Sequence, residues 1–320
     1  MPITFDWSKT ISELPGNPIP AEWLESKGKG VKVAFIDTGV NLGLASLNHL
    51  DKAGHKFFTS APGFSVAKFT GQDPVGEAFG VAGPGHGTLY ASLLAGKTPT
   101  PAPEDKDLIT GIANDADWVI IKATDPSGEV TTIRQLLEAI ELSANLGVEI
   151  VITGQCLSKS EMDFEQLSVA DVDRVFNLPG VKKMFVFAPL KNRTTVDAWT
   201  DITGENFPSN REEAFNVAKL PDIFDKVSGM IKAQNIPFLP SGFQGQLLSK
   251  TGDAMDMDFS NSGAVALMGG IAVLALSAFK TQNVGALPSR DQFTALLGTC
   301  CNPLPDTLSS VIPPAIFKKI

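Results

Sequence analysis

Short apolar stretches rich in β-branched residues alternate along the chain with stretches whose apolar positions recur every three or four residues. The first pattern is typical of strands buried on both faces of a parallel sheet, and the second of helices that cover such a sheet. Strands are predicted at 31–36, 118–123, 148–153, 183–188, 236–239 and 244–248. Helices are predicted at 21–27, 89–96, 132–145, 164–177 and 290–297, with a long apolar helix from residue 262. This alternation favours an α/β fold with a doubly wound, mostly parallel sheet.

The chain is expected to divide into a short leading segment and one large domain. Residues 1–20 contain Pro15, Pro18 and Pro20, which fix φ and lack a backbone donor, so we expect an extended segment there and no folded element. From residue 21 onward the chain has no internal repeat and no low-complexity tract. Residues 21–320 are therefore expected to form a single domain, a size that α/β folds commonly reach.

Composition and charge argue against several kinds of partner. With 43% hydrophobic residues the chain can bury a substantial core, and its net charge of −9 disfavours binding to nucleic acid and to anionic membranes. The longest uncharged apolar run, 263–279, is shorter than the roughly 20 residues needed to cross a bilayer, so we expect a buried helix there. Neither nucleic acid nor a membrane is an expected partner, and no oligomeric state is predicted.

The N-terminal sequence and the cysteines indicate the compartment. The first residues have neither the basic start nor the apolar run of a signal peptide. Cys156, Cys300 and Cys301 cannot all pair, and adjacent cysteines rarely join each other. We therefore expect a reducing, cytoplasmic location and chemically inert thiols.

Three residues stand where α/β enzymes place their chemistry, although each also has a structural explanation. Asp37 follows the strand 31–36, and ligands gather at the carboxyl ends of such strands, but a turn residue would also fit there. His86 lies between two glycines at a helix start, which lets other groups approach its ring. Ser262 opens the apolar helix. A serine there can cap the backbone, or the same free N–H groups can stabilise negative charge that develops on a substrate.

Together these segments resemble those of the subtilisin-like serine proteases, in the same order along the chain. Residues 31–40, which include Asp37, resemble the aspartate motif of that family, and residues 85–88 around His86 resemble its histidine helix. Residues 111–122 are similar to the family's Gly-Val-Ala-Pro segment and the strand after it. The serine motif is represented by residues 260–266, which keep a serine, an alanine and the small-residue helix but lack the family's Gly, Thr and Pro.

The resemblance implies a three-layer, subtilisin-like fold and a catalytic triad of Asp37, His86 and Ser262. Ser260 competes with Ser262 as nucleophile, but Ser262 alone keeps the family's spacing to the following alanine. The asparagine that the family supplies to its oxyanion hole corresponds best to Asn192, although the glycine expected before it is missing. By the same analogy, two strand edges bind the substrate, and their residues are Gly128, Glu129, Val130, Gln155, Cys156 and Leu157.

The triad indicates a serine endopeptidase that hydrolyses peptide or protein substrates through an acyl-enzyme. No metal or other cofactor is expected, and the acidic loop with Asp253, Asp256 and Asp258 is expected to be solvated and not to bind calcium. Residues 14–20 are expected to cover the cleft, as in intracellular members of the family. Two alternatives stay open: a catalytically silent fold that binds peptides or proteins, and an acyl-transfer enzyme that processes peptides in a biosynthetic pathway.

Overall fold

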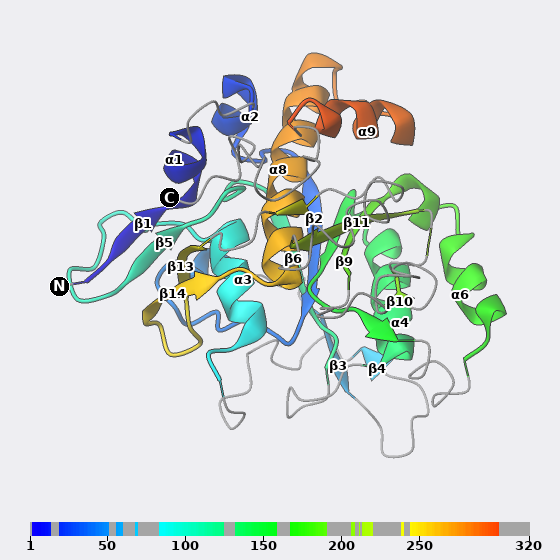
Figure 1. Ribbon diagram of the computed structural model, residues 1–320, viewed down its shortest axis with the longest axis horizontal. Helices are drawn as coiled ribbons and strands as arrows, with labels where there is room; N and C mark the ends of the chain where they lie inside the picture. The colour runs from blue at the N-terminus through cyan, green and yellow to red at the C-terminus, as the bar shows by residue number, and fades with distance from the viewer. Residues whose placement is uncertain are drawn as a thin grey trace, which may run out of the picture.

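The central element of the fold is a mostly parallel sheet. The computed structural model describes residues 2–13, 19–50, 56–59, 68–69, 83–124, 132–158, 167–190, 206–208, 211, 213–219, 238–239 and 244–300. The strands of the sheet are β2 Lys32–Asp37, β3 Lys56–Thr59, β4 Lys68–Phe69, β6 Asp117–Lys122, β7 Ile150–Thr153, β9 Phe185–Pro189, β11 Ala214–Lys219 and β12 Phe238–Leu239. Within the described ranges their order is β12-β11-β9-β7-β2-β6-β3-β4 (Figure 1). All neighbours run parallel except β3 and β4, which confirms the predicted α/β class.

Strand β2, in the middle of the sheet, sends alternate side chains to two separate hydrophobic cores. Val33 and Phe35 belong to one core, and Ala34 and Ile36 to the other. Successive side chains of a strand point to opposite faces, so a strand covered on both faces becomes an unbroken apolar run. One face is covered by α3 (His86–Ala95) and α8 (Asn261–Gln282), and the other by α4 (Ile133–Asn145) and α6 (Val169–Phe176), giving three layers (Figure 1).

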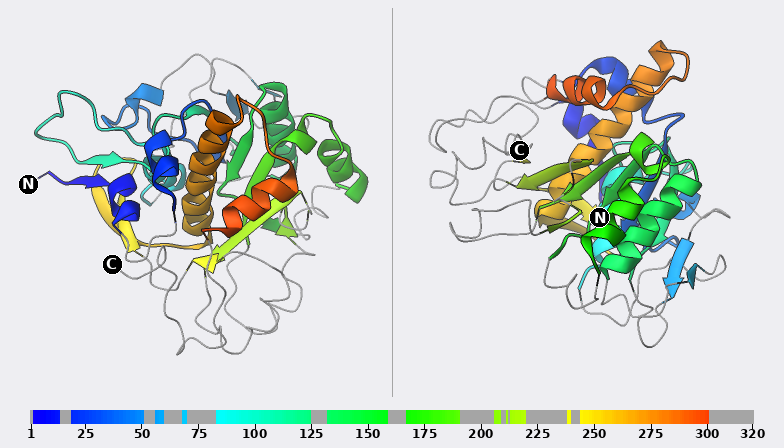
Figure 2. Two further views of the ribbon diagram at one scale, coloured as in Figure 1. Left: turned by 90° about the horizontal axis from the view of Figure 1, so that it is seen from above. Right: turned by 90° about the vertical axis from the view of Figure 1, so that its right-hand side faces the viewer.

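Helix α8 is the central helix of the larger core. It is apolar on all sides, most of its residues are buried, and it packs against the sheet, α3 and the helix α2 (Ala21–Ser26). Figure 2 shows it in two further views. The Ser26 hydroxyl of α2 donates a hydrogen bond to the Leu274 carbonyl, at 3.3 Å. Among the described helices α8 alone is long and apolar enough to cross a membrane, yet 89% of its most apolar window is buried inside the fold. A helix that is apolar all round is expected in a core, and the prediction of a buried helix is confirmed.

The N-terminal residues are folded, so the prediction of an extended segment is wrong for them. Strand β1 (Thr4–Asp6) pairs in parallel with β5 (Leu108–Thr110), and α1 (Trp7–Ser12) follows at once. The Trp7 side chain is fully buried, and its Nε1 donates to the Gln246 carbonyl at 3.0 Å. The prolines that suggested extended chain come after α1 and do not interrupt it. The division into residues 1–20 and a single domain 21–320 otherwise stays a prediction.

The segment expected to cover the cleft is described only at its end, by Ile19 and Pro20. Ile19 is buried in the same core as Trp23 of α2, and Pro20 is the N-cap of α2. The last residue of α2, Ser26, contacts α8 at Leu274, about 18 Å along that helix from Ser262 at 1.5 Å per residue. The burial of Ile19 in the core argues against a place in an open cleft for that residue. For the rest of the segment the cleft hypothesis stays a prediction, since residues 14–18 lie outside the described residues.

The remaining predicted elements differ from the structure mainly at their ends. The helices end or begin within a few residues of expectation, including α9 (Arg290–Gly298). The strand predicted at 244–248 is β13 (Gln244–Leu248), but it belongs to an antiparallel hairpin with β14 (Ala254–Asp258) and not to the central sheet. The acidic stretch expected as a loop is this strand β14. Pairing with β13 outweighs the low strand propensity of aspartate, and Gln246 Nε2 donates to Asp256 Oδ1 across the pair at 2.8 Å.

Asp107 ties the N-terminal strand and the hairpin together, which predicts a pH-dependent contribution to stability. Its carboxylate accepts hydrogen bonds from the backbone N–H groups of Ala254 (2.8 Å) and Ile3 (2.7 Å). These bonds lower the pKa of Asp107 below its ordinary value. A depressed pKa means that the contribution is present above the unfolded-state pKa and is lost as the pH falls through the folded-state pKa.

Asp107→Asn is therefore expected to lower the melting temperature at neutral pH by roughly 1–2 °C, a small shift because the group is exposed to solvent. The difference from wild type should shrink in acid, when the wild-type carboxyl is protonated as well. Thermal unfolding followed by circular dichroism from neutral to acidic pH measures it. Asp105→Asn, in the same loop and paired with Lys106, is the matched control. A difference in melting temperature between Asp107→Asn and wild type that stays constant in acid would contradict the proposed dependence on the charge of Asp107.

Candidate active site

Asp37 is the last residue of β2 and lies at the carboxyl edge of the central sheet. Its side chain is 1% exposed. Oδ1 accepts a hydrogen bond from the backbone N–H of Thr38 at 2.7 Å and lies 2.7 Å from His86 Nδ1. Oδ2 is buried and has no hydrogen-bond partner among the described residues. A buried carboxylate at this edge is thus oriented toward one imidazole.

Helix α3 brings His86 to Asp37 by packing directly on the turn after β2. Gly85, the N-cap of α3, has φ of 85°, which favours glycine. The backbone N–H of Gly87 donates to Thr38 Oγ1 at 2.9 Å, and a side chain at residue 87 would collide with the Gly39 carbonyl oxygen. The two glycines that flank His86 in sequence therefore permit this close approach, as the sequence indicated.

The imidazole of His86 is held between a carboxylate and an aromatic ring, with 37% of its side chain exposed. A proton on Nδ1 that is donated to Asp37 leaves Nε2 with a lone pair, the state in which a histidine can accept a proton. The Tyr90 ring stands edge-on to it, with the ring centres 4.9 Å apart and the planes at 76°. The pair can therefore serve as a general base with a fixed tautomer.

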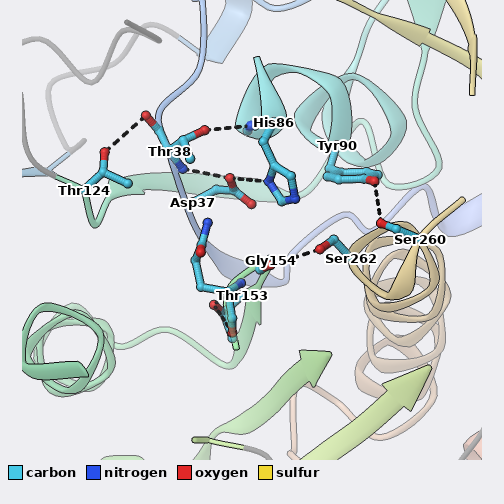
Figure 3. A network of polar contacts seen from close by, with 11 residues as sticks. Asp37, Thr38, His86, Tyr90, Thr124, Thr153, Gly154, Ser260 and Ser262 are labelled. Atoms are coloured by element: carbon cyan, nitrogen blue, oxygen red, sulfur yellow. Dashed lines mark hydrogen bonds and ion pairs between the residues drawn. The ribbon is translucent and has the colours of Figure 1, made fainter. Parts of the chain in front are cut away.

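Gly154, directly after β7, links this pair to the serine helix (Figure 3). A Cβ at residue 154 would lie 2.9 Å from His86 Cε1 and closer still to Asp37 Oδ2. The Gly154 carbonyl accepts a hydrogen bond from Ser262 Oγ at 3.1 Å. The three residues predicted as a triad, from β2, α3 and α8, thus meet around one glycine.

The first turn of α8 carries both candidate serines. Ser260 is the N-cap and Ser262 the second helical residue, so the helix begins one residue earlier than predicted. Between them, the Asn261 side chain is buried and donates to the Leu190 carbonyl at 2.7 Å, which ties the turn to the end of β9. The Ser260 hydroxyl lies 3.1 Å from the Tyr90 hydroxyl. Burial raises the pKa of Tyr90, so this hydroxyl is neutral near neutral pH.

The predicted substrate-binding and oxyanion residues are only partly described. Asn192, Gly128, Glu129 and Val130 lie outside the described residues. Gln155 and Cys156 follow Gly154 and are half-buried. Leu157 belongs to β8 (Leu157–Ser158), which pairs antiparallel with β10 (Asn206–Phe207), so one edge of this stretch is already occupied.

Metal and thiol chemistry have little support at this site. In the part of the chain that the structure describes, no group of three or more His, Cys, Asp and Glu side chains could hold a metal ion. Cys156, two residues after Gly154, is half-buried, and Cys300 is buried in the core. The expectation that the protein needs no cofactor stays a prediction.

Sequence reasoning missed Gly154, Tyr90 and Asn261. Tyr90 lies four residues after His86, and residues at this spacing share a helix face, so helical periodicity could have found it. Gly154 stands directly after a buried strand that neighbours β2, where a backbone without Cβ lets catalytic groups approach. For Asn261 the only signal was its position between the two serines.

Comparison with known proteins extends the likeness beyond these residues. A sequence profile of the Subtilase family matches residues 28–173. An intracellular serine protease of Paenibacillus polymyxa is 33% identical over 109 residues, which span 34% of this chain but only 28% of that protein. The solved structure of the prenylagaramide maturation protease PagA has a TM-score of 0.60 at 16% identity and covers 93% of this chain and 94% of that one. A lanthipeptide protease has a TM-score of 0.57 at 16% identity, with 90% and 87% covered.

The sequence match and the structural matches cover different extents of the chain. The profile covers the part that holds Asp37, His86 and Gly154, whereas Ser262 lies beyond it. The structural likeness, at identities too low to carry more than the fold, covers nearly all of the chain. The fold is therefore subtilisin-like, and residues 28–173 match the Subtilase family in sequence.

Proposed function

We propose that this protein is a serine endopeptidase in which Ser262 is the nucleophile, His86 the general base and Asp37 the residue that orients the base. The observation that carries the proposal is the 2.7 Å contact between His86 Nδ1 and the buried Asp37 carboxylate, at the edge of the sheet where Ser262 is also found. Ser262 is preferred to Ser260 because its hydroxyl bonds to Gly154, which contacts both other residues, whereas the Ser260 hydroxyl is held by Tyr90.

In the proposed reaction the Ser262 hydroxyl leaves the Gly154 carbonyl and turns to His86 Nε2. Oγ then attacks the peptide carbonyl carbon while Nε2 takes its proton, and Asp37 stabilises the imidazolium. The imidazolium returns that proton to the leaving amine as the C–N bond breaks. Water, deprotonated by the same histidine, releases the acyl group from Ser262. No metal takes part in this scheme.

The substrate is proposed to be a peptide or protein that binds in extended form beside residues 155–157, with the second edge at 128–130. Strand addition of this kind supplies backbone hydrogen bonds in register. The similarity to PagA and to a lanthipeptide protease, whose names describe maturation or peptide products, supports a precursor peptide as substrate class. We place the reaction in the cytoplasm because the curated relative is named an intracellular protease.

One alternative has an observation in its favour. The serine motif departs from the family pattern, and the Ser262 hydroxyl donates to a backbone carbonyl. Both are compatible with a silent subtilase fold that binds peptides without cleaving them. A third possibility, acyl transfer to an amine in place of water, uses the same acyl-enzyme and shares the first step of the proposed reaction.

A fluorophosphonate probe, which reacts covalently with activated serines, tests the proposal. The wild-type protein and Ser260→Ala are expected to be labelled, whereas Ser262→Ala and heat-denatured wild type are not. Mass spectrometry of the labelled peptide should place the adduct on residue 262. A folded wild-type protein without any label would refute the proposal and favour the silent fold, and an adduct on Ser260 would refute the choice of nucleophile.

A further inference from the structure

Tyr90, which the proposed triad does not use, joins the histidine helix to the start of the serine helix (Figure 3). Its side chain is 4% exposed. The ring packs edge-on against His86, and the hydroxyl lies 3.1 Å from Ser260 Oγ. A buried hydroxyl normally has a hydrogen-bond partner, but here the partner is a serine at a position that has another usual role.

That usual role is to cap the helix. A serine at the N-cap accepts a hydrogen bond from the backbone N–H of the second or third helical residue, which in α8 are Ser262 and Gly263. Ser260 has the extended backbone of a cap, with φ of −81° and ψ of −174°, and its carbonyl accepts from the Ala264 N–H at 2.9 Å. Its side chain nevertheless makes no capping hydrogen bond. The hydroxyl contacts Tyr90 instead.

We propose that Tyr90 is a positioning residue whose hydroxyl holds the Ser260 side chain away from the first turn of α8, so that the Ser262 backbone N–H stays open for the substrate. The inference rests on the proposed function. When Ser262 Oγ attacks, negative charge develops on the carbonyl oxygen beside it, and a donor fixed at that place lowers the barrier. The backbone N–H of the attacking residue is such a donor, and a capping Ser260 hydroxyl would compete for it.

The arrangement also explains why a tyrosine suits this position. Tyr90 lies one helical turn after His86, so a single side chain can contact the imidazole with its ring and reach the opposite helix with its hydroxyl. Because the phenol is neutral, it brings no negative charge beside the oxygen that becomes anionic.

The test compares the rate of fluorophosphonate labelling of four proteins: wild type, Tyr90→Phe, Ser260→Ala and the double variant. Tyr90→Phe keeps the ring and frees Ser260 to cap the helix, so we expect labelling to slow by about five- to tenfold, the factor that one cap hydrogen bond typically contributes. In the Ser260→Ala background the same substitution should change the rate by less than about twofold, since no hydroxyl remains to compete. Adding Ser260→Ala to Tyr90→Phe therefore restores the rate.

A purely structural role for Tyr90 predicts different results. If the role were purely structural, Tyr90→Phe would slow labelling equally in both backgrounds and lower the melting temperature. Our inference predicts instead that Tyr90→Phe is labelled more slowly while its melting temperature is unchanged or higher. Ser277→Ala, which removes a buried hydroxyl at the far end of α8, reports the general effect of losing a buried hydrogen bond. Equal slowing in both backgrounds, or no slowing, would overturn the role of Tyr90 while a labelled wild type leaves the proposed function intact. An unlabelled wild type would instead refute the proposed function.

Discussion

Asp37→Asn is expected to slow labelling of Ser262 by about 10⁴-fold, the loss known for the triad aspartate of a serine protease. Asp37 Oδ1 accepts from both His86 Nδ1 and the Thr38 N–H. In the variant, an amide oxygen at the Oδ1 position would bury the NH2 group at the Oδ2 position, where no described residue accepts from it, and would leave the imidazolium without a counter-charge. With the amide turned the other way, the NH2 group faces Nδ1 and can only donate to it. The imidazole then keeps its proton on Nε2, where it cannot accept the serine proton.

The measurement is the labelling rate at neutral pH, together with the circular dichroism spectrum and melting temperature of the variant. Asp105→Asn, on an exposed loop, makes the same chemical change away from the site and is expected to react like wild type. A folded Asp37→Asn protein that reacts within tenfold of wild type would show that the pair does not activate Ser262. The triad would then have to be abandoned even if the wild type is labelled.

Gly154→Ala is expected to reduce labelling by at least about 10²-fold, because the new methyl group would occupy the space in which the site is assembled. The methyl carbon would collide with Asp37 Oδ2 and lie 2.9 Å from His86 Cε1, a separation that non-bonded carbon atoms avoid. Either the carboxylate and ring move, or residue 154 moves and takes the Ser262 partner with it. Displacement of a catalytic group by about 1 Å is enough for a loss of this size.

A matched glycine distinguishes this effect from a general loss of flexibility. Gly298, the last residue of α9, is exposed and has no atom within 4 Å of its Cβ position, so Gly298→Ala should react like wild type. If the effect of Gly154→Ala is confined to the site, this variant should be labelled slowly but still unfold cooperatively. Full activity of Gly154→Ala would mean that the close packing of Asp37, His86 and Gly154 is not required for the reaction.

The predictable part of this fold is the part whose signal is local. The buried strands β2, β6 and β7 are apolar runs because both faces are covered, and the N-cap of α4, Thr132, forms a capping box with Gln135 that the sequence itself carries. The motif around Asp37 and the one around His86 are also local, because glycines placed beside these residues allow the close packing that the site needs.

The missed part depends on contacts between residues far apart in the chain. Strand β1 is too short to show a period, and it exists because it pairs with β5 about a hundred residues later. Strand β14 is rich in aspartate and is stabilised by its partner β13. Tyr90 and Ser260 are 170 residues apart, and neither motif alone indicates that their hydroxyls meet. Such pairs follow from the packing of α3 against α8, which no local pattern specifies.

Helix α8 joins the proposed nucleophile to the packing of the whole molecule. The residue that would attack the substrate stands in the first turn of α8, and the turns that follow, as far as Ala278, are buried among apolar side chains and contact α2 at Leu274. A substitution in the buried part of α8 can therefore alter the reactivity of Ser262 without contacting any reacting atom, because a tilt or shift of the helix moves its first turn. Stability and reactivity consequently depend on many of the same buried positions of α8.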